Sequence, residues 1–197
     1  MSQIREPAVA GLFYPDSPGS LQQVVDELLQ QIPDSAEAPP KAIIVPHAGY
    51  LYSGPVAASA YARLRAARAS IRRVVLLGPS HRVGFSGLAT SSADTFRTPL
   101  GDIPVDTAAV AQINALPQVH VMDLAHQQEH SLEVQLPFLQ ESLENFTLVP
   151  LVVGDAGAEE VAEVLDKLWG GDETLIVISS DLSHYHDYAT AQRMDRH

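Results

Sequence analysis

The sequence contains no cysteine, so disulfide bonds, thiolate-bound structural zinc and a cysteine nucleophile are all excluded. Any metal ion must therefore be held by nitrogen and oxygen ligands. The sequence also lacks an apolar run of about 18 residues, which a transmembrane helix would need. Residues 1–7 lack the apolar stretch of a signal peptide. We therefore expect a cytoplasmic protein that does not insert into a membrane.

Basic residues are also scarce. The chain has 12 Lys and Arg against 24 Asp and Glu, and its formal net charge is -12. Nucleic acids and anionic membranes attract clustered Lys and Arg, so we expect neither as a partner. The 197 residues, of which 46% are hydrophobic, are enough for a domain with a sizeable core. We expect residues 1–197 to form a single α/β domain.

Apolar runs typical of buried strands alternate with segments whose apolar residues recur at helical spacing. Strands are predicted at 42–45, 74–77, 148–153 and 174–179, and helices at 21–32, 55–64, 106–115, 131–143 and 159–168. Unbroken apolar strands suit a parallel sheet that is covered on both faces. The alternation predicts an α/β fold with a mostly parallel or mixed central sheet and helices on both faces.

Two prolines refine these expectations. The helix at 55–64 is expected to begin with Pro55 in its first position. Pro137 lies beyond the first turn of the helix predicted from Ser131, where it would remove a backbone hydrogen bond and kink the helix.

Residues 84–105 are expected to be irregular, with only short extended pieces.

Three predicted strands each end in a turn that bears a histidine. These histidines are His47, His81 and His184, the last with Asp181 three residues before it. In an open α/β sheet, ligands bind at the carboxyl ends of the strands. We therefore expect these side chains, which come from distant parts of the sequence, to lie along one rim. Taken singly, His47 and His81 are equally compatible with turn residues that hydrogen-bond the backbone.

This set of side chains is suited to several kinds of chemistry. Imidazoles with a carboxylate and no thiolate suit Fe(II), Zn or Cu, and two histidines with one carboxylate form a face used for non-haem iron. Asp181 could instead cap the turn that follows it or orient a histidine. His184 could act as a general acid or base, because histidine titrates near neutral pH.

The other histidines are weaker candidates when judged from the residues alone. Glu129 and His130 precede the helix predicted from Ser131, and a structural or capping role is favoured for them. The remaining histidines have no companions and are expected to be exposed to solvent: His120, His126, His186 and His197.

Five ordered segments resemble the signature blocks of Memo-like proteins, whose microbial members are often named AmmeMemoRadiSam system protein B. The segments are residues 5–15 (REPAVAGLFYP), 46–54 (PHAGYLYSG), 78–81 (GPSH), 129–137 (EHSLEVQLP) and 179–185 (SSDLSHY). Because the five blocks span nearly the whole chain in order, the resemblance is far more specific than any one motif.

The resemblance implies a fold similar to that of the class III extradiol dioxygenases, whose iron site uses two histidines and a third ligand. It implies that His47 and His81 are metal ligands. It also implies that His184, Asp181 and His130 line the same pocket as catalytic residues, with His184 near the position of the acid–base histidine. The third ligand is a cysteine in some members and belongs to a later part of the family sequence. We therefore expect this chain to lack a C-terminal portion of the family fold.

Three functions stay open at this stage. The first is an Fe(II)-dependent redox or dioxygenase-like enzyme, with Cu or Zn as the alternative metal. The second is a non-catalytic module that binds a phosphopeptide or another anionic ligand. The third is a hydrolase in which zinc activates water and Glu129 or Asp181 acts as the base. The expected partners are a small-molecule or peptide ligand and, from the resemblance, proteins of an AmmeMemoRadiSam system.

Overall fold

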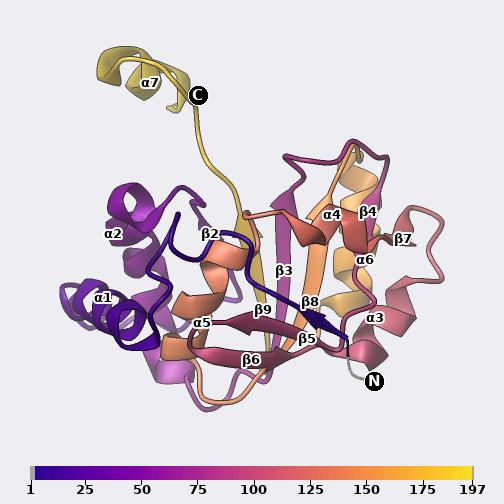
Figure 1. The fold of residues 1–197 in the computed structure, drawn as a ribbon, viewed down its shortest axis with the longest axis horizontal. Coiled ribbons are helices and arrows are strands. Elements are labelled where there is room, and N and C mark those ends of the chain that lie inside the picture. Colours follow the sequence, from indigo (N-terminus) through magenta and orange to yellow (C-terminus); the bar gives the residue numbers. More distant parts are fainter. Residues whose placement is uncertain (1–2, 197) are drawn as a thin grey trace.

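Figure 1 shows the computed structural model of the chain, which describes residues 3–196. Within this range, the main sheet has six strands in the order β2-β9-β3-β8-β4-β7. All neighbours are parallel except the antiparallel pair β4 and β8. The expected mixed, mostly parallel sheet is thus confirmed. Its strands are β2 (Ala42–Val45), β9 (Thr174–Ser179), β3 (Arg73–Pro79), β8 (Thr147–Val153), β4 (Leu88–Thr90) and β7 (Val119–Val121).

Helices flank this sheet on both sides, as predicted (Figure 1). One group of helices packs together beside β2: α1 (Pro18–Gln30), α2 (Tyr50–Tyr61), the 3-10 helix η1 (Ala62–Ala67) and α5 (Leu136–Ser142). On the other side, α3 (Thr107–Ile113) packs against α6 (Ala158–Leu168). The remaining helices are short: α4 (Asp123–Gln127), the 3-10 helix η2 (Glu133–Gln135) and α7 (Tyr188–Met194). Within residues 3–196, no helix is long and apolar enough to cross a membrane.

The apolar runs of the central strands form the middle of the core. The four residues from Val74 to Leu77 in β3 are fully buried or nearly so, and β3 lies between β9 and β8. A strand covered by helices on both faces needs apolar side chains in every position, which explains the unbroken run. The packed core therefore fixes the ends of these strands, and with them the points at which the following loops begin.

A second, smaller sheet joins the N-terminal segment to the middle of the chain. Its order is β1-β5-β6, with β1 (Ile4–Arg5), β5 (Thr95–Thr98) and β6 (Gly101–Pro104). The region 84–105, expected to be irregular, thus contributes β4, β5 and β6. The expectation was wrong for β5 because its partner, β1, lies about 90 residues earlier and a local pattern does not reveal such a pairing.

Both proline predictions were wrong, for related reasons. Helix α2 begins at Tyr50, not at Pro55, so the proline lies inside the helix. The early start is stabilised by a backbone hydrogen bond from the N–H of Tyr50 to the carbonyl of Phe13. Helix α5 begins at Leu136, so Pro137 lies in its first turn, where its missing N–H has no helical partner to lose.

The carboxylate of Glu133 ties the N-terminal segment to the core. It is 1% exposed, pairs with the Arg5 guanidinium, and accepts hydrogen bonds from the backbone N–H groups of Ala8 and Val9 and from the hydroxyl of Tyr14. Burial, together with the nearby Glu133 charge, raises the pKa of Tyr14 well above its usual value, so the tyrosine stays a neutral donor.

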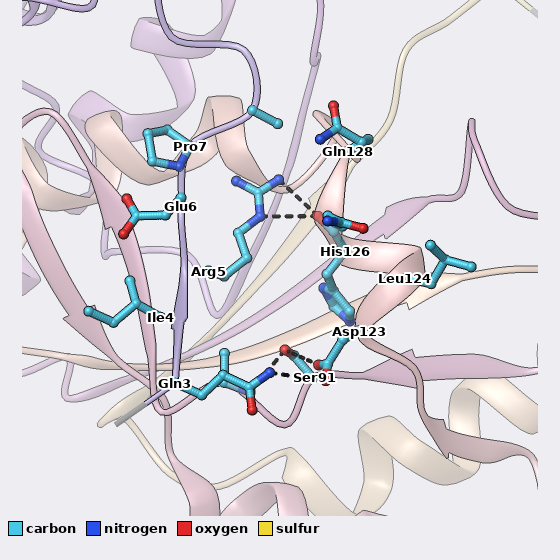
Figure 2. A pocket seen from close by; sticks show the side chains of 13 residues that line it. Gln3, Ile4, Arg5, Glu6, Pro7, Ser91, Asp123, Leu124, His126 and Gln128 are labelled. Carbon is cyan, nitrogen blue, oxygen red and sulfur yellow. Dashed lines mark hydrogen bonds between the residues drawn. The ribbon is translucent and has the colours of Figure 1, made fainter. Parts of the chain in front are cut away.

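Arg5 extends this connection to the segment between α4 and η2. Its guanidinium donates to the backbone carbonyls of His126 and Glu129, at 2.9 and 3.0 Å for His126 and 2.6 Å for Glu129. Figure 2 shows the side chain reaching across from β1 toward α4, beside a cavity of about 470 Å³. Arg5 therefore holds both ends of the segment 126–129, which leads directly into His130.

His126 contradicts the expectation that it lies at the surface. It is 2% exposed, and its ring Nε2 lies 3.0 Å from the carbonyl oxygen of Ala89 in β4. Burial lowers the pKa of His126 from 6.5 to about 4, so the ring is neutral at physiological pH. His120 and His186 are exposed, as expected, while His197 lies outside the described residues.

Glu133→Gln should destabilise the protein by about 3 kcal/mol, because it leaves the buried guanidinium of Arg5 without its counter-charge. The measurement is urea-induced unfolding at neutral pH. Glu144→Gln, at an exposed position, is the matched control and should change stability by less than about 0.5 kcal/mol. Equal stabilities for the two variants would contradict the role assigned to Glu133.

The buried ring of His126 should make stability fall as the solution is acidified. Its pKa is 6.5 when unfolded and about 4 when folded. The unfolded chain therefore binds more protons between these values, and stability is lost as the pH falls through them. The contribution is on the order of 3 kcal/mol. His126→Gln retains an N–H donor for Ala89 but does not titrate, so its unfolding free energy should fall less steeply with decreasing pH. His120→Gln, at an exposed position, should keep the wild-type slope.

Candidate metal centre

Three imidazoles from distant parts of the chain meet at the carboxyl ends of the central strands. His47 follows β2, His81 follows β3, and His130 follows α4 in the segment held by Arg5. The ring centroids are 5.1 Å apart for His47 and His81, 5.6 Å for His47 and His130, and 4.5 Å for His81 and His130. One nitrogen from each ring lies within 4.8 Å of the other two. This group of residues, here called the histidine cluster, could hold a metal ion.

The cluster lies at the boundary between the core and solvent. His47 is 3% exposed, His130 is half-buried, and the His81 side chain is 36% exposed. Burial, reinforced by the neighbouring imidazoles, lowers the pKa of both His47 and His130, although nearby carboxylates oppose the shift. Rings with lowered pKa values are neutral at physiological pH, which is the form that binds metal ions.

Glu129 lies beneath the histidine cluster and orients it. Its carboxylate accepts hydrogen bonds from the backbone N–H groups of His81, His130 and Ser131 at 2.6 to 2.9 Å. One of its oxygens also lies 2.8 Å from Nδ1 of His81 and 3.3 Å from Nδ1 of His130. The residues alone favoured a structural or capping role for Glu129, with catalysis as a base in one alternative, and did not indicate that it orients the histidines.

The ionisation of Glu129 determines the tautomer of His81. Burial alone would raise the pKa of this carboxyl, but the hydrogen bonds from His81 and Ser131 outweigh it and hold the pKa below its usual value. An ionised carboxylate only accepts hydrogen bonds, so Nδ1 of His81 must carry the proton in the neutral ring. Nε2 of His81 is then left with a free lone pair, as a metal ligand requires.

Asp181 and His184 lie next to His47, in the segment that leaves β9. Asp181 accepts a hydrogen bond from the backbone N–H of His47 at 2.7 Å. Its other oxygen lies 3.6 Å from Nε2 of His47 and 3.3 Å from Nε2 of His184. The His184 side chain is 56% exposed and reaches the histidine cluster through Asp181. The structure thus gathers all five residues that the sequence singled out, with His184 outermost.

Phe13 covers one side of the histidine cluster. Its ring centroid lies 4.7 Å from that of His130, at an interplanar angle of 46°. The backbone carbonyl of Phe13 accepts the hydrogen bond that starts α2, three residues after His47. The N-terminal segment therefore contributes an apolar wall to the site besides its ion pair with Glu133.

Comparison with known proteins shows which family the chain resembles along nearly its whole length. Residues 5–197 match the family model described as Memo-like protein. A MEMO1 family protein of Aquifex aeolicus is 39% identical over 197 residues, covering 98% of this chain and 72% of the relative. A MEMO1 family protein of Methanopyrus kandleri is 36% identical, covering 98% of this chain and 73% of the relative. Protein MEMO1 of Xenopus laevis is 37% identical, covering 93% of this chain and 64% of the relative.

Glu129→Gln should weaken the binding of a divalent cation by about 10- to 100-fold, because the amide no longer enforces the metal-binding tautomer of His81. Zn²⁺ affinity can be measured by competition with a chromogenic chelator, with circular dichroism to verify folding. Glu159→Gln, at an exposed position in α6, is the control and should bind as the wild type does. A folded Glu129→Gln protein with unchanged Zn²⁺ affinity would disprove the orienting role.

Proposed function

The chain belongs to the Memo-like protein family, and from this premise we propose that His47, His81 and His130 hold a divalent metal ion used in redox chemistry. The observation that carries the proposal is the convergence of one nitrogen from each ring within 4.8 Å. These residues lie tens of positions apart along the chain, so local packing alone does not bring their side chains together in this way.

The proposal gives His130 the role of third ligand. The resemblance had implied a cysteine for that role in some members and a catalytic role for His130. Here the ring of His130 lies closer to that of His81 than His47 does, with centroids 4.5 Å apart against 5.1 Å. His130 thus supplies a third nitrogen beside those of His47 and His81.

Fe(II) is the metal we propose, with Cu and Zn as alternatives. Neutral imidazoles with carboxylates close by suit all three ions. Fe(II) held by three protein ligands keeps open positions, and it would supply redox or oxygen chemistry there.

Asp181 and His184 are proposed to move protons between the histidine cluster and solvent. The carboxylate of Asp181 lies between Nε2 of His47 and Nε2 of His184, at 3.6 and 3.3 Å. The exposed ring of His184 can exchange protons with water, while Asp181 is largely shielded, with its side chain 16% exposed. This pair therefore offers a path for a proton between solvent and a molecule bound at the histidine cluster, and Nε2 of His47 remains available to the metal.

A metal-assisted hydrolase is the second candidate, and one observation favours it. Zinc hydrolases use three protein ligands plus a water molecule, and a carboxylate nearby serves as the base. Asp181 occupies such a position, because its Oδ2, which also contacts His184, lies 3.6 Å from Nε2 of His47. At the same histidine cluster, a binding module would bind an anionic ligand without turnover.

The proposal predicts about one equivalent of Fe(II) per chain when the protein is purified without oxygen and reconstituted, since the three rings form one site. His47→Ala and His130→Ala should each lower the affinity at least 10-fold, and His120→Ala, an exposed histidine elsewhere, should have no effect. Elemental analysis and anaerobic titration are the measurements. The proposal fails if the wild type binds no iron, copper or zinc, or if His47→Ala matches it.

Activity assays on the loaded protein separate the candidates. The redox function predicts oxygen consumption with a reductant by the iron form, slowed at least 10-fold in His184→Gln with metal content unchanged. The hydrolase predicts ester or phosphate cleavage by the zinc form. Saturable binding of a phosphopeptide by metal-free protein, without turnover in either form, would favour the binding module.

A further inference from the structure

A line of buried hydrogen bonds leads from helix α2 to the ring of His47. The hydroxyl of Tyr61 donates to Oε1 of Gln135 at 2.9 Å, and Nε2 of Gln135 donates to Oγ of Ser179 at 2.9 Å. Oγ of Ser179 lies 3.1 Å from Nδ1 of His47. All four residues are at most 3% exposed, so water does not compete for these contacts.

The orientation of the Gln135 side chain is determined by its other neighbour. Its Nε2 also lies 2.9 Å from the backbone carbonyl oxygen of Pro46, and a carbonyl only accepts hydrogen bonds. The NH₂ group must therefore face Pro46 and Ser179, which uses both of its protons. Oε1 then faces Tyr61, whose hydroxyl must be the donor.

The single hydroxyl proton of Ser179 is likewise used in one hydrogen bond. Oγ lies 2.6 Å from the backbone carbonyl oxygen of Ser131, which accepts it. Toward Gln135 and His47, Ser179 can therefore act only as an acceptor. Nδ1 of His47 must then carry a hydrogen, and in the neutral ring Nε2 has the free lone pair.

We propose that Ser179, oriented by Gln135 and Tyr61, is a positioning residue that keeps His47 in the Nδ1–H tautomer. For its effect on metal binding this inference depends on the proposed function, but the tautomer is a property of the metal-free protein. Ser179 and Glu129 then each fix the tautomer of a different ring. Ser179 fixes that of His47 with a neutral hydroxyl and Glu129 fixes that of His81 with a charge, so Nε2 carries the free lone pair in both rings.

The experiment is ¹⁵N NMR of the imidazole nitrogens in metal-free wild type, Ser179→Ala and Ser179→Thr, where signals absent from His47→Ala identify the ring. Wild type should show His47 in the Nδ1–H form. Ser179→Ala should shift the ring toward the Nε2–H form, and Ser179→Thr, which retains a hydroxyl, should restore the wild-type spectrum. Ser142→Ala is the matched control, because among the described residues Ser142 is a buried serine whose Oγ has no hydrogen-bond partner.

Zn²⁺ titration of the same proteins measures the consequence. Ser179→Ala should bind Zn²⁺ about 10- to 100-fold more weakly than the wild type, while Ser179→Thr and Ser142→Ala bind normally. An Nε2–H ring in the wild type, or an unchanged tautomer in Ser179→Ala, overturns the inference. The wild-type spectrum decides the question even if Ser179→Ala does not fold. If the tautomer shifts as expected but no protein binds metal, the inference holds and the proposed metal function fails.

Discussion

The arrangement of the site depends on one buried carboxylate, that of Glu129. An ionised group with 1% exposure is costly unless hydrogen-bond donors surround it, and here three backbone N–H groups and a ring nitrogen do so. Those donors belong to His81, His130 and Ser131. The hydrogen bonds that stabilise the buried Glu129 carboxylate therefore also hold two of the three imidazoles, those of His81 and His130, close together.

The surroundings make this arrangement rigid. His47 and His81 leave the carboxyl ends of β2 and β3, so their positions depend on the sheet. Strand β3 is buried on both faces, whereas β2 is an edge strand that buries Ile43 and Val45 and exposes Ile44. His130 has no strand behind it. Its segment is held from outside, by the guanidinium of Arg5 on the carbonyls of His126 and Glu129 and by the ring of Phe13. A site built from two strand ends and one clamped loop can bind a ligand without folding around it.

Much of this architecture could be predicted from local patterns. The unbroken apolar runs identified the central strands, and the rule that ligands bind at strand ends placed His47, His81 and Asp181 near one another. What could not be predicted depends on partners far away in the sequence. Strand β5 pairs with β1, α2 starts where Phe13 accepts a hydrogen bond, and His126 is buried because α4 packs on β4. Glu129 looks like a solvated cap until the loop of His81, 48 residues earlier, is folded against it.

The ion pair of Arg5 and Glu133 has a consequence for biosynthesis. Its two residues are 128 positions apart, so the first segment to be synthesised can pack only after residues well past the middle of the chain have been added. Contacts of such long range form late, because closing the loop costs entropy before the contact repays it. Until then the imidazole of His130 lies far from the other two. A chain that has not yet formed this contact does not present the three imidazoles together, so the histidine cluster is assembled only when the fold closes.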